Sequence, residues 1–192
     1  AQVIVNATTR TRGYNLETGE VIWSCGGMTV NTVPSPVVGN GMVYVTSGFQ
    51  NYVMQAIRLD KAVGDITGSD AVAWAYNRHT PYVPSPLLYG DKLYFLKNRS
   101  NVLTCLSANT GEVIYSQQRL KGIRGVYASP VGVNGRVYLT GRRGTTVVIR
   151  HGAEFEVLAT SPLDDRFDAS PAVVDDALYL RGYRYLYCIA SD

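Results

Sequence analysis

Residues that could perform chemistry are few and scattered along this chain of 192 residues. Its two histidines, His79 and His151, have no second histidine or cysteine at the spacing of a metal site. Neither a Ser-His-Asp triad nor a glycosidase carboxylate pair can be assigned from residue order. We therefore predict no catalytic residue and no metal site, with His79 on a loop near a channel mouth and His151 in a turn.

The three cysteines match neither a zinc site nor a disulfide framework. Cys105 and Cys188 fall at the same position of two repeated units, farther apart than the ~7 Å between Cα atoms that a disulfide allows. We expect both to be small, buried hydrophobic residues. We expect Cys25 to be a partly buried free thiol.

Two acidic segments could contact a cation. The segment 64–70 superficially resembles a calcium loop, but it lacks the alternating carboxylates and terminal glutamate of an EF-hand. A lengthened hairpin is the preferred interpretation. Asp164, Asp165 and Asp168 cluster beside Arg166, where we prefer a solvated loop and keep a ligand or cation contact as the alternative.

Repeated units must position these residues. A Ser-Pro step followed by apolar residues and a turn recurs at Ser35, Ser85, Ser129 and Ser170, with spacings of 50, 44 and 41 residues. A period in this range is typical of propeller or solenoid arrays. Each unit predicts four short strands, A to D, with a tyrosine at one equivalent position of strand B: Tyr44, Tyr94, Tyr138 and Tyr179.

Four antiparallel strands in ~45 residues make a propeller blade. We predict an all-β chain, a β-propeller of about four to five blades that forms an incomplete ring. Missing sequence or a second chain would complete that ring. The predicted units are a partial blade at 1–25, blades at about 33–76, 83–116 and 127–159, and a partial blade at 168–192.

A second marker, the hairpin GYNLETGEVIW, ends at Trp23 and returns as CLSANTGEVIY, which ends at Tyr115. It resembles the tryptophan-docking repeat of quinoprotein-like (PQQ-like) β-propellers, which include BamB-type outer-membrane assembly factors and PQQ-enzyme-repeat proteins. The first unit matches at Gly13, Asn15, Thr18, Gly19 and Trp23, and the third at Cys105, Ser107, Thr110, Gly111 and Tyr115. The second keeps Ala56 and Trp74, and the fourth is degenerate, with Val148, Gly152 and Val157.

The resemblance implies structural roles for this motif. The glycine of each Thr-Gly step would supply the positive φ of the C–D turn. The outer-strand aromatic residue would cover the gap between adjacent blades. The predicted docking residues are Thr18, Gly19, Trp23, Trp74, Thr110, Gly111 and Tyr115.

The net charge of +3 is too small to indicate nucleic-acid binding, and no apolar run approaches the ~20 residues of a membrane span. The predicted topology nevertheless places the basic and the acidic residues in two different sets of turns, on opposite faces of the propeller. B–C turns and D–A connections collect Arg10, Arg12, Arg78, Lys97, Arg99, Arg119, Lys121, Arg124, Arg142, Arg143, Arg166, Arg181 and Arg184. A–B and C–D turns collect Glu17, Glu20, Asp60, Asp65, Asp70, Asp91, Glu112, Glu154, Asp175 and Asp176.

We therefore expect a non-catalytic binding or scaffold module, in a periplasmic or otherwise extracytoplasmic location, that presents its basic face to a protein partner or a small anionic ligand. The candidate contact residues are Asn31, His79, Tyr82, Arg124, Tyr127, Arg142, Arg143, Asp165 and Asp168. No cofactor is expected. The alternative implied by the resemblance is part of a PQQ-dependent alcohol or sugar dehydrogenase, which would need PQQ stacked on a channel tryptophan and a calcium ion.

Overall fold

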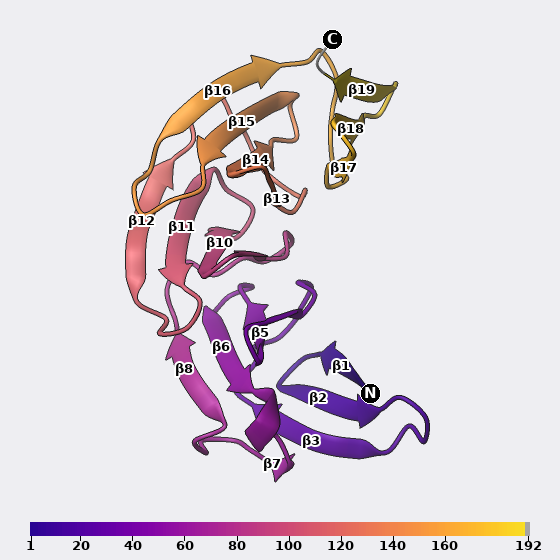
Figure 1. The fold of residues 1–192 in the computed structure, drawn as a ribbon, viewed down its shortest axis with the longest axis vertical. Helices are drawn as coiled ribbons and strands as arrows, with labels where there is room; N and C mark the ends of the chain where they lie inside the picture. Colours follow the sequence, from indigo (N-terminus) through magenta and orange to yellow (C-terminus); the bar gives the residue numbers. More distant parts are fainter. Residues whose placement is uncertain (191–192) are drawn as a thin grey trace.

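A computed structural model describes residues 1–190, which form five β-sheets fanned along an arc (Figure 1). The all-β prediction is confirmed. In this part of the chain the only helix is the three-residue 3-10 turn η1 (Leu59–Lys61), and no helix there has the length and apolar character needed to cross a membrane.

We call the sheets blades 1 to 5 in chain order. Blade 1 contains β1 (Gln2–Asn6), β2 (Arg10–Asn15) and β3 (Val21–Gly26), which occupy positions B, C and D of the repeat. Blade 2 contains β4 (Val37–Gly39), β5 (Met42–Ser47), β6 (Val53–Arg58) and β8 (Val72–Tyr76). Blade 3 contains β9 (Leu87–Tyr89), β10 (Lys92–Leu96), β11 (Val102–Ser107) and β12 (Val113–Arg119). Blade 4 contains β13 (Val131–Val133), β14 (Arg136–Thr140), β15 (Thr145–Arg150) and β16 (Val157–Pro162). Blade 5 contains β17 (Ala172–Val174), β18 (Ala177–Arg181) and β19 (Leu186–Ala190).

The segment that lengthens the outer hairpin of blade 2 also extends blade 1. Its short strand β7 (Gly64–Asp65) pairs in parallel with β3, so that Gly64 lies opposite Trp23. Ile66 follows β7 and is buried in the cluster that contains Trp23. The sequence indicated the longer hairpin but gave no sign that it becomes the outermost strand of the neighbouring blade.

A row of paired residues across each blade explains the repeated small and aromatic positions. In blade 2, Tyr44 lies opposite Ala56, and Ala56 lies opposite Trp74. The small Ala56 side chain leaves room for the two rings to approach over it, with centroids 5.9 Å apart. Blade 3 repeats the row with Tyr94, Cys105 and Tyr115.

Blade 4 departs from this row. Val148 pairs with Ala159, so the predicted aromatic-equivalent position, Val157, is wrong by two residues. A register shift after Val148 explains the error. Strand D starts only at Val157, and the Phe155 ring packs from the preceding turn against Tyr115, with centroids 5.8 Å apart.

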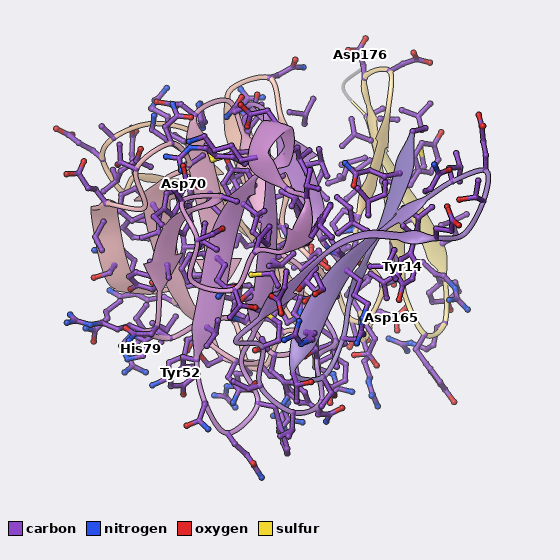
Figure 2. The ribbon with its side chains drawn as sticks, turned by 90° about the horizontal axis from the view of Figure 1, so that it is seen from below. Tyr14, Tyr52, Asp70, His79, Asp165 and Asp176 are labelled. Atoms are coloured by element: carbon purple, nitrogen blue, oxygen red, sulfur yellow. The ribbon has the colours of Figure 1, made fainter. Side chains whose placement is uncertain are left out.

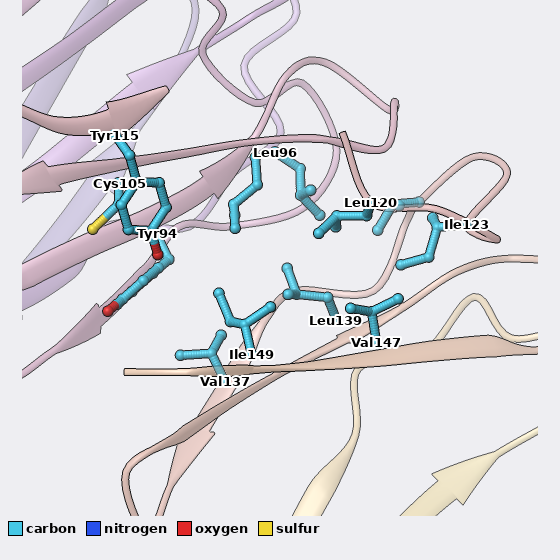
Figure 3. Close-up of a cluster of buried hydrophobic side chains, with 12 residues drawn as sticks. Tyr94, Leu96, Cys105, Tyr115, Leu120, Ile123, Val137, Leu139, Val147 and Ile149 are labelled. Carbon is cyan, nitrogen blue, oxygen red and sulfur yellow. The ribbon is translucent and has the colours of Figure 1, made fainter. Parts of the chain in front are cut away.

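The core consists of hydrophobic clusters between successive blades. Figure 3 shows the cluster between blades 3 and 4, where Leu96 and Tyr94 face Val137, Leu139 and Ile149. Similar clusters join blade 1 to blade 2 and blade 2 to blade 3. Each fully buried side chain of this size contributes roughly 1.5–3 kcal/mol. Blades therefore stabilise one another face to face.

Two cysteine predictions need correction. Cys188 is exposed rather than buried, because it pairs with Tyr179 and has no outer strand opposite it within residues 1–190. Cys25 is only 1% exposed and so is fully rather than partly buried. Cys105 is buried as expected, and burial raises the pKa of its thiol to about 12.

The predicted docking residues lie in two equivalent turns and at contacts between blades. Gly19 and Gly111 have φ values of +75° and +74° in equivalent turns, and each glycine N–H donates back to the strand-C carbonyl four residues earlier. The indole N–H of Trp74 reaches across to blade 3 and donates to the Ala108 carbonyl at 2.9 Å. Trp23 is completely buried between blades 1 and 2, where its N–H donates to Gln2.

The Ser-Pro step has a structural role that the sequence did not reveal. The backbone N–H of Ser35 donates to the Ser85 hydroxyl at 3.0 Å, Ser85 to Ser129 at 3.0 Å, and Ser129 to Ser170 at 2.9 Å. One hydroxyl per repeat thus accepts the N–H of the preceding blade, just before strand A. This serine chain links blades 2 to 5.

Candidate binding face

Loops of two kinds emerge on opposite sides of the arc. We call the side with the B–C turns and D–A connections the loop face, and the other the hairpin face. In the side view of Figure 2, Tyr52 and His79 of the loop face lie away from Asp70 and Asp176 of the hairpin face.

Backbone hydrogen bonds join neighbouring loops of the loop face. Asn98 in the B–C turn of blade 3 donates to Thr80 in the preceding D–A connection at 3.1 Å. Val126 in the next connection donates to Arg99 at 3.0 Å. These bonds cross between blades, so the loops have fixed positions relative to one another.

Side-chain contacts also join neighbouring loops of the loop face. Asn31 donates to the hydroxyl of Tyr82 at 2.6 Å, and the guanidinium of Arg99 lies 5.5 Å from the Tyr82 ring centroid. Arg99 also donates to the Tyr127 hydroxyl at 3.5 Å. Residues from three successive D–A connections are therefore joined through the B–C turn of blade 3.

Arg142 continues this chain toward blade 5. Its guanidinium lies 3.8 Å from the Tyr127 ring centroid, a cation–π geometry, and donates to both Asp168 oxygens at 2.5 and 3.2 Å. Arg166 donates to the same carboxylate at 2.9 Å. The hydrogen bond from Arg142, assisted by that from Arg166, lowers the pKa of Asp168 despite partial burial. We call this series the arginine–tyrosine ladder: Asn31, Tyr82, Arg99, Tyr127, Arg142, Asp168 and Arg166.

Of the nine predicted contact residues, five belong to the ladder: Asn31, Tyr82, Tyr127, Arg142 and Asp168. Arg124 and Arg143 are exposed beside it and line one cavity together with Arg142 and Arg166. His79 lies apart, edge-on to Tyr52 with centroids 6.1 Å apart. Burial and then the nearby Lys97 and Arg78 lower the pKa of His79, which favours its neutral ring.

Asp165 has a structural position. Its side chain is 2% exposed, and its oxygens accept backbone N–H bonds from Arg166, Arg184 and Tyr185. Burial alone would raise the pKa of this carboxyl, but these donors lower it. The interpretation of the acidic cluster as a solvated loop is therefore wrong for Asp165, which joins the β16–β17 connection to the β18–β19 turn.

Ion pairing differs between the two faces. On the hairpin face, Lys61 pairs with Asp70, Lys92 with Asp91, and Arg150 with Glu156. Within residues 1–190 no ion pair involves these basic residues of the loop face: Arg12, Arg78, Lys97, Arg99, Arg119, Lys121, Arg124, Arg143 and Arg181.

One predicted member of the acidic face is misplaced. Asp65 lies in β7 beside blade 1 and pairs with Arg10 at 3.0 Å. Hydrogen bonds from Thr67 and then Arg10 lower the pKa of Asp65 to about 2. The lengthened hairpin therefore neutralises a loop-face arginine.

Sequence reasoning omitted Arg99 and Arg166 from the contact residues. Arg99 occupies the B–C turn of blade 3, as Arg142 does in blade 4. Aligning the turns of successive repeats would have identified it. Arg166 was noted only as a neighbour of the acidic cluster, because its shared carboxylate with Arg142 depends on packing between two loops.

The residues present do not fit a quinone and calcium site. Trp23 and Trp74 are both used in contacts between blades, and Trp74 donates its N–H to the chain itself. Among residues 1–190, no group of three or more His, Cys, Asp or Glu side chains is placed to hold a metal ion. His151 Nδ1 lies 2.8 Å from the Tyr94 hydroxyl, inside the contact between blades 3 and 4.

Comparison with known proteins bears on the fold and the family. The family model described as "Outer membrane protein assembly factor BamB" (PQQ_2) matches residues 2–191. No curated protein sequence matches the chain significantly.

Three solved structures align with the chain at low sequence identity, and the two with TM-scores above 0.5 share its fold. The crystal structure of the computationally designed Ika8 protein aligns with a TM-score of 0.71 at 12% identity, over 94% of this chain and 52% of Ika8. Europium-containing methanol dehydrogenase aligns with a TM-score of 0.52 at 15% identity, over 66% of this chain and 24% of the enzyme. BamB from Moraxella catarrhalis gives a TM-score of 0.48 at 12% identity, over 94% of this chain and 66% of that protein. The chain thus spans about half the length of Ika8.

Proposed function

Because the chain belongs to the PQQ_2 family, described as outer membrane protein assembly factor BamB, we propose that it is a non-catalytic propeller module that binds through its loop face. The molecule that binds to this face is a protein partner or an anionic ligand. We also propose an extracytoplasmic location at the outer membrane, on the family's description alone.

The observation that carries this proposal is the arginine–tyrosine ladder. Its aromatic rings and guanidinium groups are held by contacts between loops, as in the stacking of Arg142 on Tyr127. Arginine and tyrosine supply large contact areas and directional hydrogen bonds, and they are enriched in binding hot spots. Preorganised side chains lose little conformational entropy on binding.

The charge distribution supports the same face. Among residues 1–190, basic side chains without an ion pair concentrate there, whereas lysines and arginines of the hairpin face mostly have acidic partners. A surface of one charge sign accelerates association with an oppositely charged partner and makes binding sensitive to salt.

Affinity capture from an extract of the source organism tests the proposal. The double variant Arg99→Glu/Arg143→Glu reverses two loop-face charges, and Arg136→Glu reverses one exposed charge on the hairpin face. We expect the wild type and Arg136→Glu to retain the same partner, with less retained as salt rises, and the double variant to lose it. Equal retention by the double variant would contradict a loop-face site.

A further inference from the structure

A cavity of about 650 Å3 opens on the loop face, and arginines form most of its lining. The lining residues are Arg124, Gly125, Arg142, Arg143 and Arg166. They come from three consecutive loops: the β12–β13 connection, the β14–β15 turn and the β16–β17 connection. Four other cavities of the described residues are each lined by at most two cationic side chains.

The walls of this cavity are joined to one another. The N–H of Arg142 donates to the Gly125 carbonyl at 3.0 Å, and the N–H of Phe167 donates to the Arg142 carbonyl at 3.2 Å. The Arg142 side chain is also fixed between Tyr127 and Asp168. The cavity is therefore built before any ligand enters it.

Its charges are not balanced. Within residues 1–190, Asp168 is the only carboxylate that forms an ion pair with any of these four arginines, and it pairs with two of them, Arg142 and Arg166. Arg124 and Arg143 have no ion pair within residues 1–190 and are exposed. Three positive charges thus remain uncompensated around one cavity. Their mutual repulsion favours an anion with several charges over a single chloride.

We propose that this arginine cavity binds phosphoryl groups, in a ligand that carries at least two negative charges. Guanidinium groups match phosphate oxygens with paired N–H donors. Within residues 1–190, no ion pair occupies the donors of Arg124 or Arg143. The volume lies within the range of small-molecule sites. The proposal rests on the proposed function, since it specifies a ligand class for the same face. Free phosphate compounds and lipid headgroups share this chemistry.

Isothermal titration of the whole chain with inorganic pyrophosphate tests the cavity. We expect saturable binding that weakens about tenfold or more in Arg124→Ala and in Arg143→Ala, because each removes a charge-assisted contact. Arg136→Ala removes an equal charge from the hairpin face and should leave the affinity unchanged. Thermal melting of each variant confirms that it is folded. An equal loss in Arg136→Ala would overturn the proposal, because binding would then follow net charge alone.

Flotation with phosphatidylcholine vesicles, with and without phosphatidic acid, identifies the source of the phosphoryl group. Arg143-dependent binding to the acidic vesicles alone would assign the cavity to a headgroup, and binding to pyrophosphate alone would assign it to a soluble compound. Failure of both probes would overturn the proposal. If Arg99→Glu/Arg143→Glu still abolished partner capture in that case, the proposed function would stand without the phosphoryl site. If pyrophosphate bound but Arg99→Glu/Arg143→Glu left partner capture unaffected, the phosphoryl site would stand and the proposed function would fail.

Discussion

The indole N–H of Trp74 donates a 2.9 Å hydrogen bond to the carbonyl of Ala108, across the boundary between blades 2 and 3. The ring also lies over Gly111, where an added Cβ would stand 2.6 Å from the ring carbon Cδ2 of Trp74. Gly111 therefore serves two purposes, a left-handed turn and a surface for the neighbouring ring. Gly19 in blade 1 has the same backbone conformation with no atom of another residue within 4 Å of such a Cβ.

These two glycines form a matched pair for substitution. Gly19→Ala should cost about 1 kcal/mol of unfolding free energy, from the positive φ alone. Gly111→Ala should cost about 1–3 kcal/mol more, because the new methyl group displaces the Trp74 ring. Urea denaturation of both variants measures the difference. Equal losses would show that Trp74 does not depend on this close approach.

Trp23 tests the burial of the docking residue in blade 1. It is fully buried, and Trp23→Ala should lower the free energy of unfolding by about 3–5 kcal/mol. Val21 on the same strand is 54% exposed, so Val21→Ala should change it by less than about 0.5 kcal/mol. A loss below about 1 kcal/mol for Trp23→Ala would contradict the docking role.

The serine chain predicts a difference between two chemically identical substitutions. Ser129→Ala removes the acceptor of the Ser85 N–H and should destabilise the chain by about 0.5–1.5 kcal/mol. Ser35→Ala keeps the Ser35 N–H donor and removes a hydroxyl that accepts no hydrogen bond in the structure described, so its effect should be close to zero. Chemical denaturation compares the two. A cost for Ser35→Ala as large as that for Ser129→Ala would assign the effect to backbone propensity in the D–A connection instead of the hydroxyl acceptor.

His151 should make stability depend on pH. Burial, and then the nearby Lys92, lower its pKa from the ordinary 6.5, although Asp91 opposes them. The unfolded chain then binds the His151 proton more tightly than the folded chain, so this contribution is complete above pH 6.5 and is lost as the pH falls toward the folded pKa. His151→Gln should be less stable than wild type by about 1 kcal/mol near neutral pH, since it loses the contact with Tyr94.

The measurement for His151 is the difference in unfolding free energy between wild type and His151→Gln at about pH 7.5 and about pH 5.5. We expect the difference to shrink in acid, because the wild type alone loses the His151 contribution. The pKa of His79 is lowered too, but His79 is present in both proteins and cancels. A difference that stays constant with pH would contradict a neutral, half-buried His151.

The sequence was sufficient for most features that lie within blades 1 to 3. The Thr-Gly turns and the strand order follow from local periodicity, the small residue opposite each docking aromatic follows from the PQQ-like resemblance, and the family match confirms that resemblance. Blade 4 is the exception, because a register shift moves its aromatic-equivalent position by two residues. Contacts between blades were harder to predict. The acceptor of the Ser85 N–H is a hydroxyl 44 residues away, and no local pattern marks it.

The candidate site shows the same limit. Topology placed Tyr127 and Arg142 on one face, but their stacking and the shared use of Asp168 depend on side-chain directions in two separate loops. The ion pair between Arg10 and Asp65 forms only because β7 joins the neighbouring blade. A parallel pairing of two residues leaves no periodic pattern in the sequence, so this ion pair could not be predicted.

Photo-crosslinking in cells of the source organism tests most directly whether the loop face is the binding surface. A photoreactive residue would replace Arg78 on the loop face or Glu112 on the hairpin face, both exposed and both outside the arginine cavity. We predict discrete crosslinked products from position 78 and none from position 112. Crosslinks from position 112 with none from position 78 would contradict the proposed binding face.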